Sequence, residues 1–179
     1  MVDLETMGDV SNSTIVSIGA VEFDINTGEI GRQFYCRVDL QSCLDLGLIV
    51  NGKTIYWWLK QNETARLEIS KGGDNIITAL AKLSNFFNNI DCNYDFQIWS
   101  NGVRFDISLL SDAYSKAKLS IPWDFHNERD VRTLISFAPK IKEHYPFTGI
   151  KHNALHDCIY QIAYCSAIWQ KLNINTDPI

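Results

Sequence analysis

The sequence predicts a single mixed α/β domain, and three observations lead to that prediction. The chain has 179 residues, 46% hydrophobic and 21% charged, which is typical of a globular protein. Residues 1–39 carry the pattern of strands, whereas the remainder combines helical periodicity with short strand-like runs. A chain of this length buries about 70% of its unfolded surface, so both faces of a sheet can be covered without disulfides or a structural metal. We therefore expect residues 1–179 to form one domain.

The amino-terminal part is expected to be a three-stranded meander. Residues 15–24 are rich in β-branched and aromatic types, and a turn at Asn26-Thr27-Gly28 leads into residues 30–39, where apolar side chains alternate. These two segments predict a β-hairpin. The short run from Met1 to Thr6 is expected to pair with it as the first strand.

The remainder is expected to be mainly helical. Helical spacing of apolar residues predicts helices at 54–62 and 75–89, a helix after Asn101-Gly102, a short helix through Leu134 and Ile135, and a last helix from about 153 to 172. A short buried strand is expected at residues 96–99 and a weaker one near 125–130. Residues 139–151 contain two prolines and are expected to be a loop.

Charge, cysteine content and hydropathy restrict the class of protein. The 16 basic and 21 acidic residues give a formal net charge of −5, which argues against tight binding to a polyanion unless some acids hold metal ions. Five cysteines without a C-x-x-C pair predict reduced thiols, no zinc site and a cytoplasmic location. No apolar run approaches the roughly 20 residues of a membrane span, and acidic residues stand where a signal peptide would be basic. We expect neither a membrane nor a secretory role.

Four acidic residues are candidates for chemistry. Asp3 and Glu5 are two residues apart on a predicted strand and therefore project from the same face. Asp106 falls in the first turn of a predicted helix that follows a strand, and Asp157 lies early in the last helix. Taken singly, the first pair would suit a solvent-facing edge strand, and Asp106 would suit the positive end of a helix dipole.

A histidine accompanies the fourth acid. His152 precedes Asp157 by five residues, so the two side chains converge only if the helix begins between them, with Asn153 as its N-cap. Alone, a loop histidine beside a lysine would usually be a solvated surface residue.

The joint order of these residues resembles the DEDD exonucleases, and within them the histidine-bearing, DnaQ-like (DEDDh) branch. That order is Asp-x-Glu on the first strand, Asp at a strand-to-helix turn and His-x4-Asp at the last helix. The chain is most similar to the exonuclease VIII-like family of 3′-5′ exoribonucleases. This closer resemblance is carried by Asn101-Gly102-Val103-Arg104-Phe105-Asp106, Thr54-Ile55-Tyr56-Trp57-Trp58 and Arg129-Asp130-Val131-Arg132-Thr133-Leu134.

The resemblance covers nearly the whole chain and implies a fold and an activity. The implied fold is ribonuclease-H-like, a central mixed β-sheet flanked by helices on both faces, forming one 3′-5′ exonuclease domain. The implied reaction is two-metal phosphodiester hydrolysis with two Mg²⁺ or Mn²⁺ ions. Asp3, Glu5 and Asp157 would hold one ion, Asp3 and Asp106 the other, and His152 would be the general base. Two such ions would offset four carboxylate charges, which removes the charge argument against nucleic acid.

The resemblance also suggests substrate contacts. Leu4, Thr6 and Met7 flank the acids and are candidates for the terminal nucleotide, while Asn101 would either bind the nucleotide or close a turn. Trp57 and Trp58 are adjacent and point about 100° apart in a helix, so one is expected in the core and Trp57 is the candidate for stacking on a base.

The expected partner is a nucleic acid with a single-stranded 3′ end, RNA being favoured over DNA. Two alternatives remain open: a proofreading-type 3′-5′ exodeoxyribonuclease, and a catalytically silent nucleic-acid-binding domain. A homodimer is expected only by analogy with relatives.

Overall fold

The computed structural model describes residues 1–90 and 96–172, and its centre is a five-stranded mixed sheet. The sheet order is β3-β2-β1-β4-β5. Strand β1 is antiparallel to β2 and parallel to β4, so it is an interior strand and not an edge. The predicted meander is confirmed. The strands are β1 (Val2–Thr6), β2 (Ile15–Phe23), β3 (Ile30–Arg37), β4 (Ile98–Ser100) and β5 (Glu128–Asp130).

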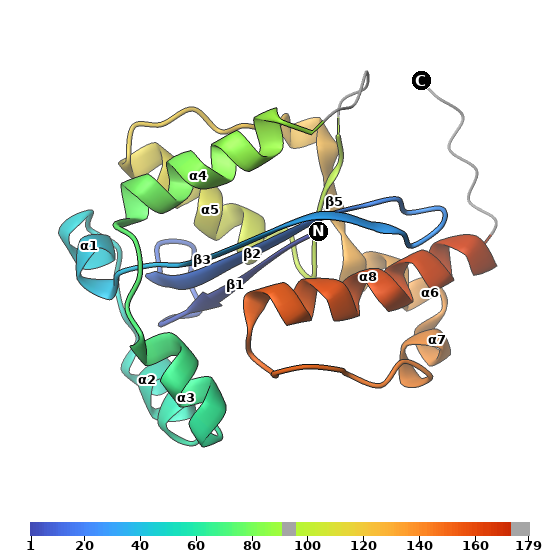
Figure 1. The fold of residues 1–179 in the computed structure, drawn as a ribbon, viewed down its shortest axis with the longest axis horizontal. Helices are drawn as coiled ribbons and strands as arrows, with labels where there is room; N and C mark the ends of the chain where they lie inside the picture. The colour runs from blue at the N-terminus through green and yellow to red at the C-terminus, as the bar shows by residue number, and fades with distance from the viewer. Residues whose placement is uncertain (91–95, 173–179) are drawn as a thin grey trace.

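Helices cover both faces of this sheet (Figure 1). Helices α4 (Ile76–Asn88) and α5 (Asp106–Lys116) lie on one face. Helices α6 (Val131–Phe137), α7 (Pro139–Glu143) and α8 (Ala154–Lys171) lie on the other. Helix α1 (Leu40–Asp45) follows β3, and α2 (Gly52–Leu59) and α3 (Glu63–Ser70) form a hairpin beyond the carboxyl end of β1. The prediction of helices on both faces is therefore confirmed.

Two apolar cores fill the layers on either side of the sheet. One packs Val2 and Leu4 of β1 against α4 and α5, and the other packs Val21 and Trp99 against α6 and α8. Because side chains alternate along a strand, Asp3 and Glu5 project from the opposite face of β1, the face that α8 covers. Full burial of each large apolar side chain contributes about 1.5–3 kcal/mol, so two such cores can offset some unfavourable burial of charge.

Six helices, α1 to α4, α6 and α8, begin at asparagine or aspartate side chains that accept backbone N–H groups. These N-caps satisfy donors that have no partner inside the helix, and replacing one with alanine typically costs about 1 kcal/mol. The capping residues are Asp39, Asn51, Asn62, Asn75, Asp130 and Asn153.

The structure corrects parts of the predicted secondary structure. The predicted loop at 139–151 is wrong for its first five residues, Pro139–Glu143, which form α7. Proline is tolerated at the first position of a helix because that N–H would be unpaired in any case. The strand expected at 125–130 is limited to β5, because Phe125–Asn127 form a 3₁₀ turn. Helices α1 and α3 were not predicted.

The described cysteines agree with the expectation of reduced thiols. Cys36, Cys43, Cys158 and Cys165 are free and buried, and Cys92 lies outside the described residues. Within residues 1–90 and 96–172, no helix has the length and apolar character needed to cross a membrane.

Gly19 controls how closely α8 approaches the sheet. A Cβ at Gly19 would lie 2.6 Å from the backbone nitrogen of Leu155 and closer still to the carbonyl of Ala154. Gly19 is also the register partner of Asp3 in the β1–β2 pair. The missing side chain therefore allows the start of α8 to lie directly over the strand pair beside Asp3.

We expect Gly19→Ala to lower the free energy of unfolding by about 1–3 kcal/mol, because the added methyl group must push α8 away from β2. Urea denaturation followed by circular dichroism measures this change. The matched control is Gly52→Ala, because a Cβ at Gly52 would have no atom within 4 Å. Equal losses in the two variants would show that close packing at Gly19 is not the cause.

Candidate active site

Three of the four predicted acids converge. Asp3, Glu5 and Asp157 each offer a carboxylate oxygen, and these oxygens lie within 4.8 Å of one another. The strand alternation of β1 supplies the first two. The Asn153 side chain accepts the backbone N–H of His156, so α8 begins where the sequence predicts and Asp157 falls in its first turn. The result is a cluster of three carboxylates at the junction of β1 and α8.

Asp106 lies near this cluster but is not one of the three residues whose oxygens lie within 4.8 Å of one another. It is the first residue of α5 and is buried. Burial raises the pKa of Asp106 to about 7, although backbone hydrogen bonds from Gly102 and Leu4 and the charge of Arg132 act in the opposite direction. Its charge in turn raises the pKa values of Asp3 and Glu5, so the four acids form one electrostatic unit.

The buried carboxyl groups are unusually hard to ionise. Burial, followed by the charges of Asp106, Glu5 and Asp157, raises the pKa of Asp3 well above its usual value. Burial and then Asp157 and Asp106 do the same to Glu5. The pKa of Asp157 is also raised by burial, while the neighbouring His152 opposes the rise. A site that must be ionised at neutral pH therefore requires a source of positive charge.

His152 lies next to Asp157, as the capping argument predicts, since it acts on the carboxyl group through both its charge and its backbone N–H. Its backbone is left-handed, with φ 62°. The imidazole meets the rings of Trp57 and Trp58 edge-on, at centroid distances of 4.9 and 5.8 Å. The other histidine of this segment, His156, accepts the backbone N–H of Ile150 and fastens the preceding loop.

The predicted substrate residues lie around the acids but differ in what they expose. The Leu4 side chain is buried in the core on the opposite face and its backbone N–H is directed to Asp106, so its side chain is not available to a ligand at the acids. The Thr6 hydroxyl donates to the carbonyl of Gly8, and Met7 packs among Trp58 and Ala65.

Trp57 and Asn101 are the two remaining residues predicted to contact substrate. Trp57 is 44% exposed and Trp58 only 3%, so the expectation that one tryptophan belongs to the core is confirmed. The Trp58 indole donates to the carbonyl of Thr6 at 2.8 Å and ties α2 to the end of β1. Asn101 is half-buried, and its carbonyl accepts the backbone N–H of Arg132 in the turn before α5.

Sequence reasoning missed two residues that support the acids. Gln161 of α8 donates from Nε2 to Oδ1 of Asp3 at 2.7 Å. Asp130 caps α6 and also accepts the backbone N–H of Val103, which holds the turn that leads to Asp106. The spacing of Gln161, four residues after Asp157 on one helix, is the signal that could have revealed the first.

The donor set fits a divalent cation. Carboxylate oxygens are the ligands that Mg²⁺ and Mn²⁺ prefer, and zinc would favour thiolate or imidazole. Oδ2 of Asp157 is buried and has no hydrogen-bond partner among residues 1–90 and 96–172, which is unfavourable unless a cation is bound. The nearby Cys158 thiol contacts backbone carbonyls, and its raised pKa makes it a poor ligand. The carboxylate cluster is thus suited to hold divalent metal.

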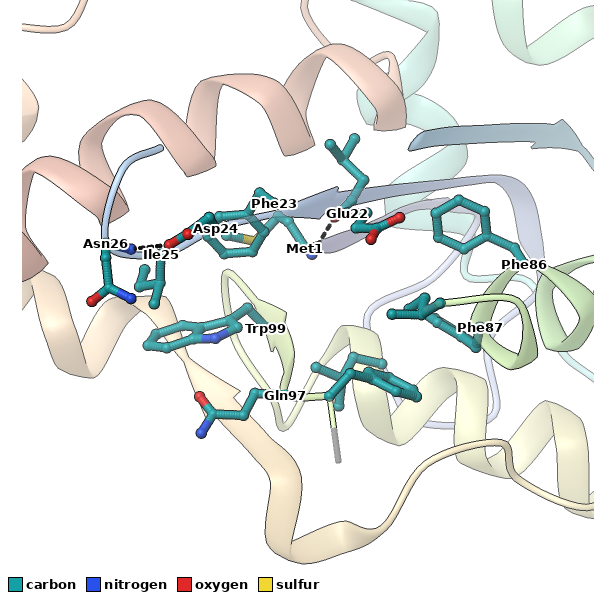
Figure 2. Close-up of a pocket in the computed structure, with 14 residues that line it drawn as sticks. Met1, Glu22, Phe23, Asp24, Ile25, Asn26, Phe86, Phe87, Gln97 and Trp99 are labelled. Carbon is teal, nitrogen blue, oxygen red and sulfur yellow. Dashed lines mark hydrogen bonds between the residues drawn. The ribbon is translucent and has the colours of Figure 1, made fainter. Parts of the chain in front are cut away.

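The aromatic cavity shown in Figure 2 is separate from this cluster. Its volume is about 440 Å³, and it is lined from the amino ends of β1 and β4 and the carboxyl end of β2. Phe23 and Trp99 stand toward one end and Phe86 and Phe87 toward the other (Figure 2). None of the four acids lines it.

The amino-acid sequence of this chain is similar to a known domain family and to a phage protein. Residues 1–169 match the 3′-5′ exoribonuclease Rv2179c-like domain. An exodeoxyribonuclease of Enterobacteria phage T4 is 26% identical over an alignment of 194 positions, gaps included, that covers 90% of this chain and 85% of the phage protein.

Solved structures agree on the fold. The nuclease domain of 3′hExo, a DEDDh family member bound to rAMP, has a TM-score of 0.69 at 14% identity, covering 95% of this chain and 90% of that one. Cell-death related nuclease 4 (CRN-4) has a TM-score of 0.65 at 14% identity, covering 96% of this chain and 62% of that one. These matches confirm the predicted ribonuclease-H-like fold. The match over residues 1–169 shows that this chain belongs to the 3′-5′ exoribonuclease Rv2179c-like domain family and is therefore a 3′-5′ exonuclease.

Proposed function

We propose that residues 1–179 form one metal-dependent 3′-5′ exoribonuclease domain that shortens single-stranded RNA or 3′ overhangs. The observation that carries this proposal is the convergence of Asp3, Glu5 and Asp157, whose oxygens lie within 4.8 Å of one another. Asp106 adds a fourth carboxylate and His152 a titratable ring beside Asp157. Two ions, Mg²⁺ or Mn²⁺, would be held by the four acids, with Asp3 shared between them.

Each residue has a role that its surroundings support. Bound divalent ions would supply the positive charge that keeps four carboxylates ionised and stabilises charge on the scissile phosphate. Among the described residues, the His152 ring has no hydrogen-bond partner, so its neutral form has a ring nitrogen free to take the proton of the attacking water. The bond from phosphorus to the 3′ oxygen breaks as the bond to the water oxygen forms, and the departing 3′ oxygen takes a proton from solvent, which releases a nucleoside 5′-monophosphate. Asp157 stabilises the resulting imidazolium.

Trp57 and Met7 are the residues we propose to contact a nucleobase. The Trp57 ring is 44% exposed and lies beside His152, where a base entering the site would meet it. Stacking on one aromatic side chain is worth about 1–3 kcal/mol. Met7 lies two residues beyond Glu5 and packs against Trp58, so its apolar side chain lies close to the tryptophan pair.

RNA is the proposed substrate because of what the relatives act on. The matched domain is described as an exoribonuclease, and one solved neighbour binds rAMP. DNA is the second candidate, because the phage T4 relative is an exodeoxyribonuclease. The homodimer and the cytoplasmic location stay predictions.

A time course on 5′-labelled single-stranded RNA and DNA tests the activity. With Mg²⁺ or Mn²⁺ we expect a ladder that shortens from the 3′ end, faster on RNA, and that is lost with EDTA or in Asp157→Asn. Asp45→Asn is the matched control, because Asp45 is exposed on α1 and, among residues 1–90 and 96–172, its side chain is hydrogen-bonded only by Gln41. Faster loss of DNA would select the second candidate. An intact, folded protein that shortens neither strand would refute the proposal.

The role of His152 is tested with His152→Asn, because asparagine tolerates the left-handed backbone of this position better than alanine does. We expect kcat to fall by about 10²- to 10⁴-fold, the usual contribution of a general base. Mn²⁺ affinity, measured by isothermal titration calorimetry without nucleic acid, should stay within about twofold. Parallel losses of turnover and Mn²⁺ affinity would contradict the assignment.

The raised pKa values predict how stability depends on pH. Because the pKa values of Asp3, Glu5 and Asp106 are higher in the folded than in the unfolded chain, the folded state binds more protons. The free energy of unfolding without metal should therefore fall as the pH rises from about 4, the unfolded pKa, through about 7, the value for Asp106.

Urea denaturation in EDTA at about pH 5 and about pH 7.5 measures this fall. Asp106→Asn should reduce the difference between the two pH values, because it removes one titrating group. Mn²⁺ should restore stability at the higher pH, since it binds the folded, ionised site. Stability that rises with pH in EDTA would contradict the pKa directions.

A further inference from the structure

We propose that Gln161 is a positioning residue for Asp3, holding that carboxylate in the orientation in which it binds a divalent cation. The inference rests on the proposed function, because it assigns Gln161 a role at the same metal site. Nε2 of Gln161 donates to Oδ1 of Asp3 at 2.7 Å. Among the described residues, Gln161 is the side chain that forms a hydrogen bond with this carboxylate.

The geometry of α8 directs Gln161 to Asp3. Residues four apart on a helix share a face, so Gln161 follows Asp157 on the side that faces the sheet. The absent side chain at Gly19, the register partner of Asp3, lets that face lie close to the strand pair. Asp157 and Gln161 therefore reach the site from the same helix. Asp157 would be a metal ligand itself, whereas Gln161 would orient the ligand Asp3.

Stability alone does not account for an amide at this position. Gln161 is 4% exposed, and its Oε1 is buried with no hydrogen-bond partner among residues 1–90 and 96–172. Burying an unpaired amide oxygen is unfavourable, whereas an apolar side chain of similar size would fill the space without that cost. The neighbouring helix residues Cys158 and Ile162 are in the apolar core. The favourable contact that Gln161 makes is the one with Asp3.

An amide suits this task better than a cationic side chain would. The torsion that rotates an aspartate carboxylate is soft, so a hydrogen-bond partner decides its orientation. A neutral N–H donor occupies one lone pair and leaves the charge of Asp3 available to metal. A lysine at the same place would neutralise the carboxylate and repel a cation. In the proposed function Asp3 would be a ligand of both ions, so its orientation would affect the binding of each.

The test measures metal binding and stability separately. Gln161→Leu removes the amide at similar volume, and Gln161→Asn keeps an amide that is one methylene too short to reach Asp3. The matched control is Ser166→Ala, because Ser166 is also buried on α8 and its hydroxyl has no hydrogen-bond partner within the described part of the chain, but it packs beside Gly28, away from the acids. Mn²⁺ binding is measured by calorimetry without nucleic acid, and unfolding is measured in EDTA.

We expect Gln161→Leu to weaken Mn²⁺ binding by about 10- to 100-fold, as is usual when the partner of a metal ligand is removed. Its urea midpoint in EDTA should change little, because removal of the unpaired Oε1 offsets loss of the hydrogen bond to Asp3. Gln161→Asn should lose Mn²⁺ affinity similarly, and Ser166→Ala should keep it. Gln161→Met provides a second apolar variant in case Gln161→Leu does not fold.

The outcomes separate this inference from the proposed function. Folded Gln161→Leu or Gln161→Met that binds Mn²⁺ as tightly as the unchanged protein would overturn the inference and leave the function intact. Failure of both apolar variants to fold would show a structural role and also overturn it. If the unchanged protein neither binds Mn²⁺ nor shortens RNA or DNA, the proposed function fails and the inference fails with it.

Discussion

The mutual repulsion of carboxylates that the fold holds together is the constraint on which the rest of the structure depends. Three of them have oxygens within 4.8 Å of one another, and burial makes each harder to ionise. Such a site lowers the stability of the metal-free chain at neutral pH and must be offset elsewhere. The apolar cores on the two faces of the sheet supply that stability, and the N-caps that start α6 and α8 hold the polar turns in register. The apolar cores and the helix caps therefore stabilise the fold, whereas the carboxylate cluster destabilises it.

Strand β1 connects these two requirements. Its five residues alternate between the core under α4 and α5 and the acids under α8, so a slip of one residue would exchange buried leucine for buried acid. The strand is held on both sides, by β2 and by β4. At its carboxyl end the Trp58 indole binds the carbonyl of Thr6, while the same ring meets His152 edge-on. One tryptophan thus joins the end of β1 to the histidine that precedes α8.

Much of this arrangement could be predicted because it follows from periodicity and order along the chain. β-Branched content and alternation predicted the hairpin of β2 and β3, and the short run before it was expected to be β1, which places Asp3 and Glu5 on one face. The Asn153 cap predicted the meeting of His152 with Asp157. Helices α1, α3 and α7 were missed because they are short and one begins with proline. Gln161 was missed because a single glutamine in a helix belongs to no motif, and its meaning depends on a strand far away in sequence. The choice between RNA and DNA depends on contacts with a 2′-hydroxyl, which no spacing of residues reveals.

The geometry of α8 also bears on how this family can vary during evolution. Because a helix turns by about 100° per residue, inserting or deleting one residue between Asp157 and Gln161 would rotate one of them away from β1. The loop before Ile150 has no such restriction, since the contact of Ile150 with His156 and the Asn153 cap fix the start of the helix whatever the length of chain before them. Divergence in length should therefore accumulate ahead of the histidine, while the four-residue spacing on α8 is preserved.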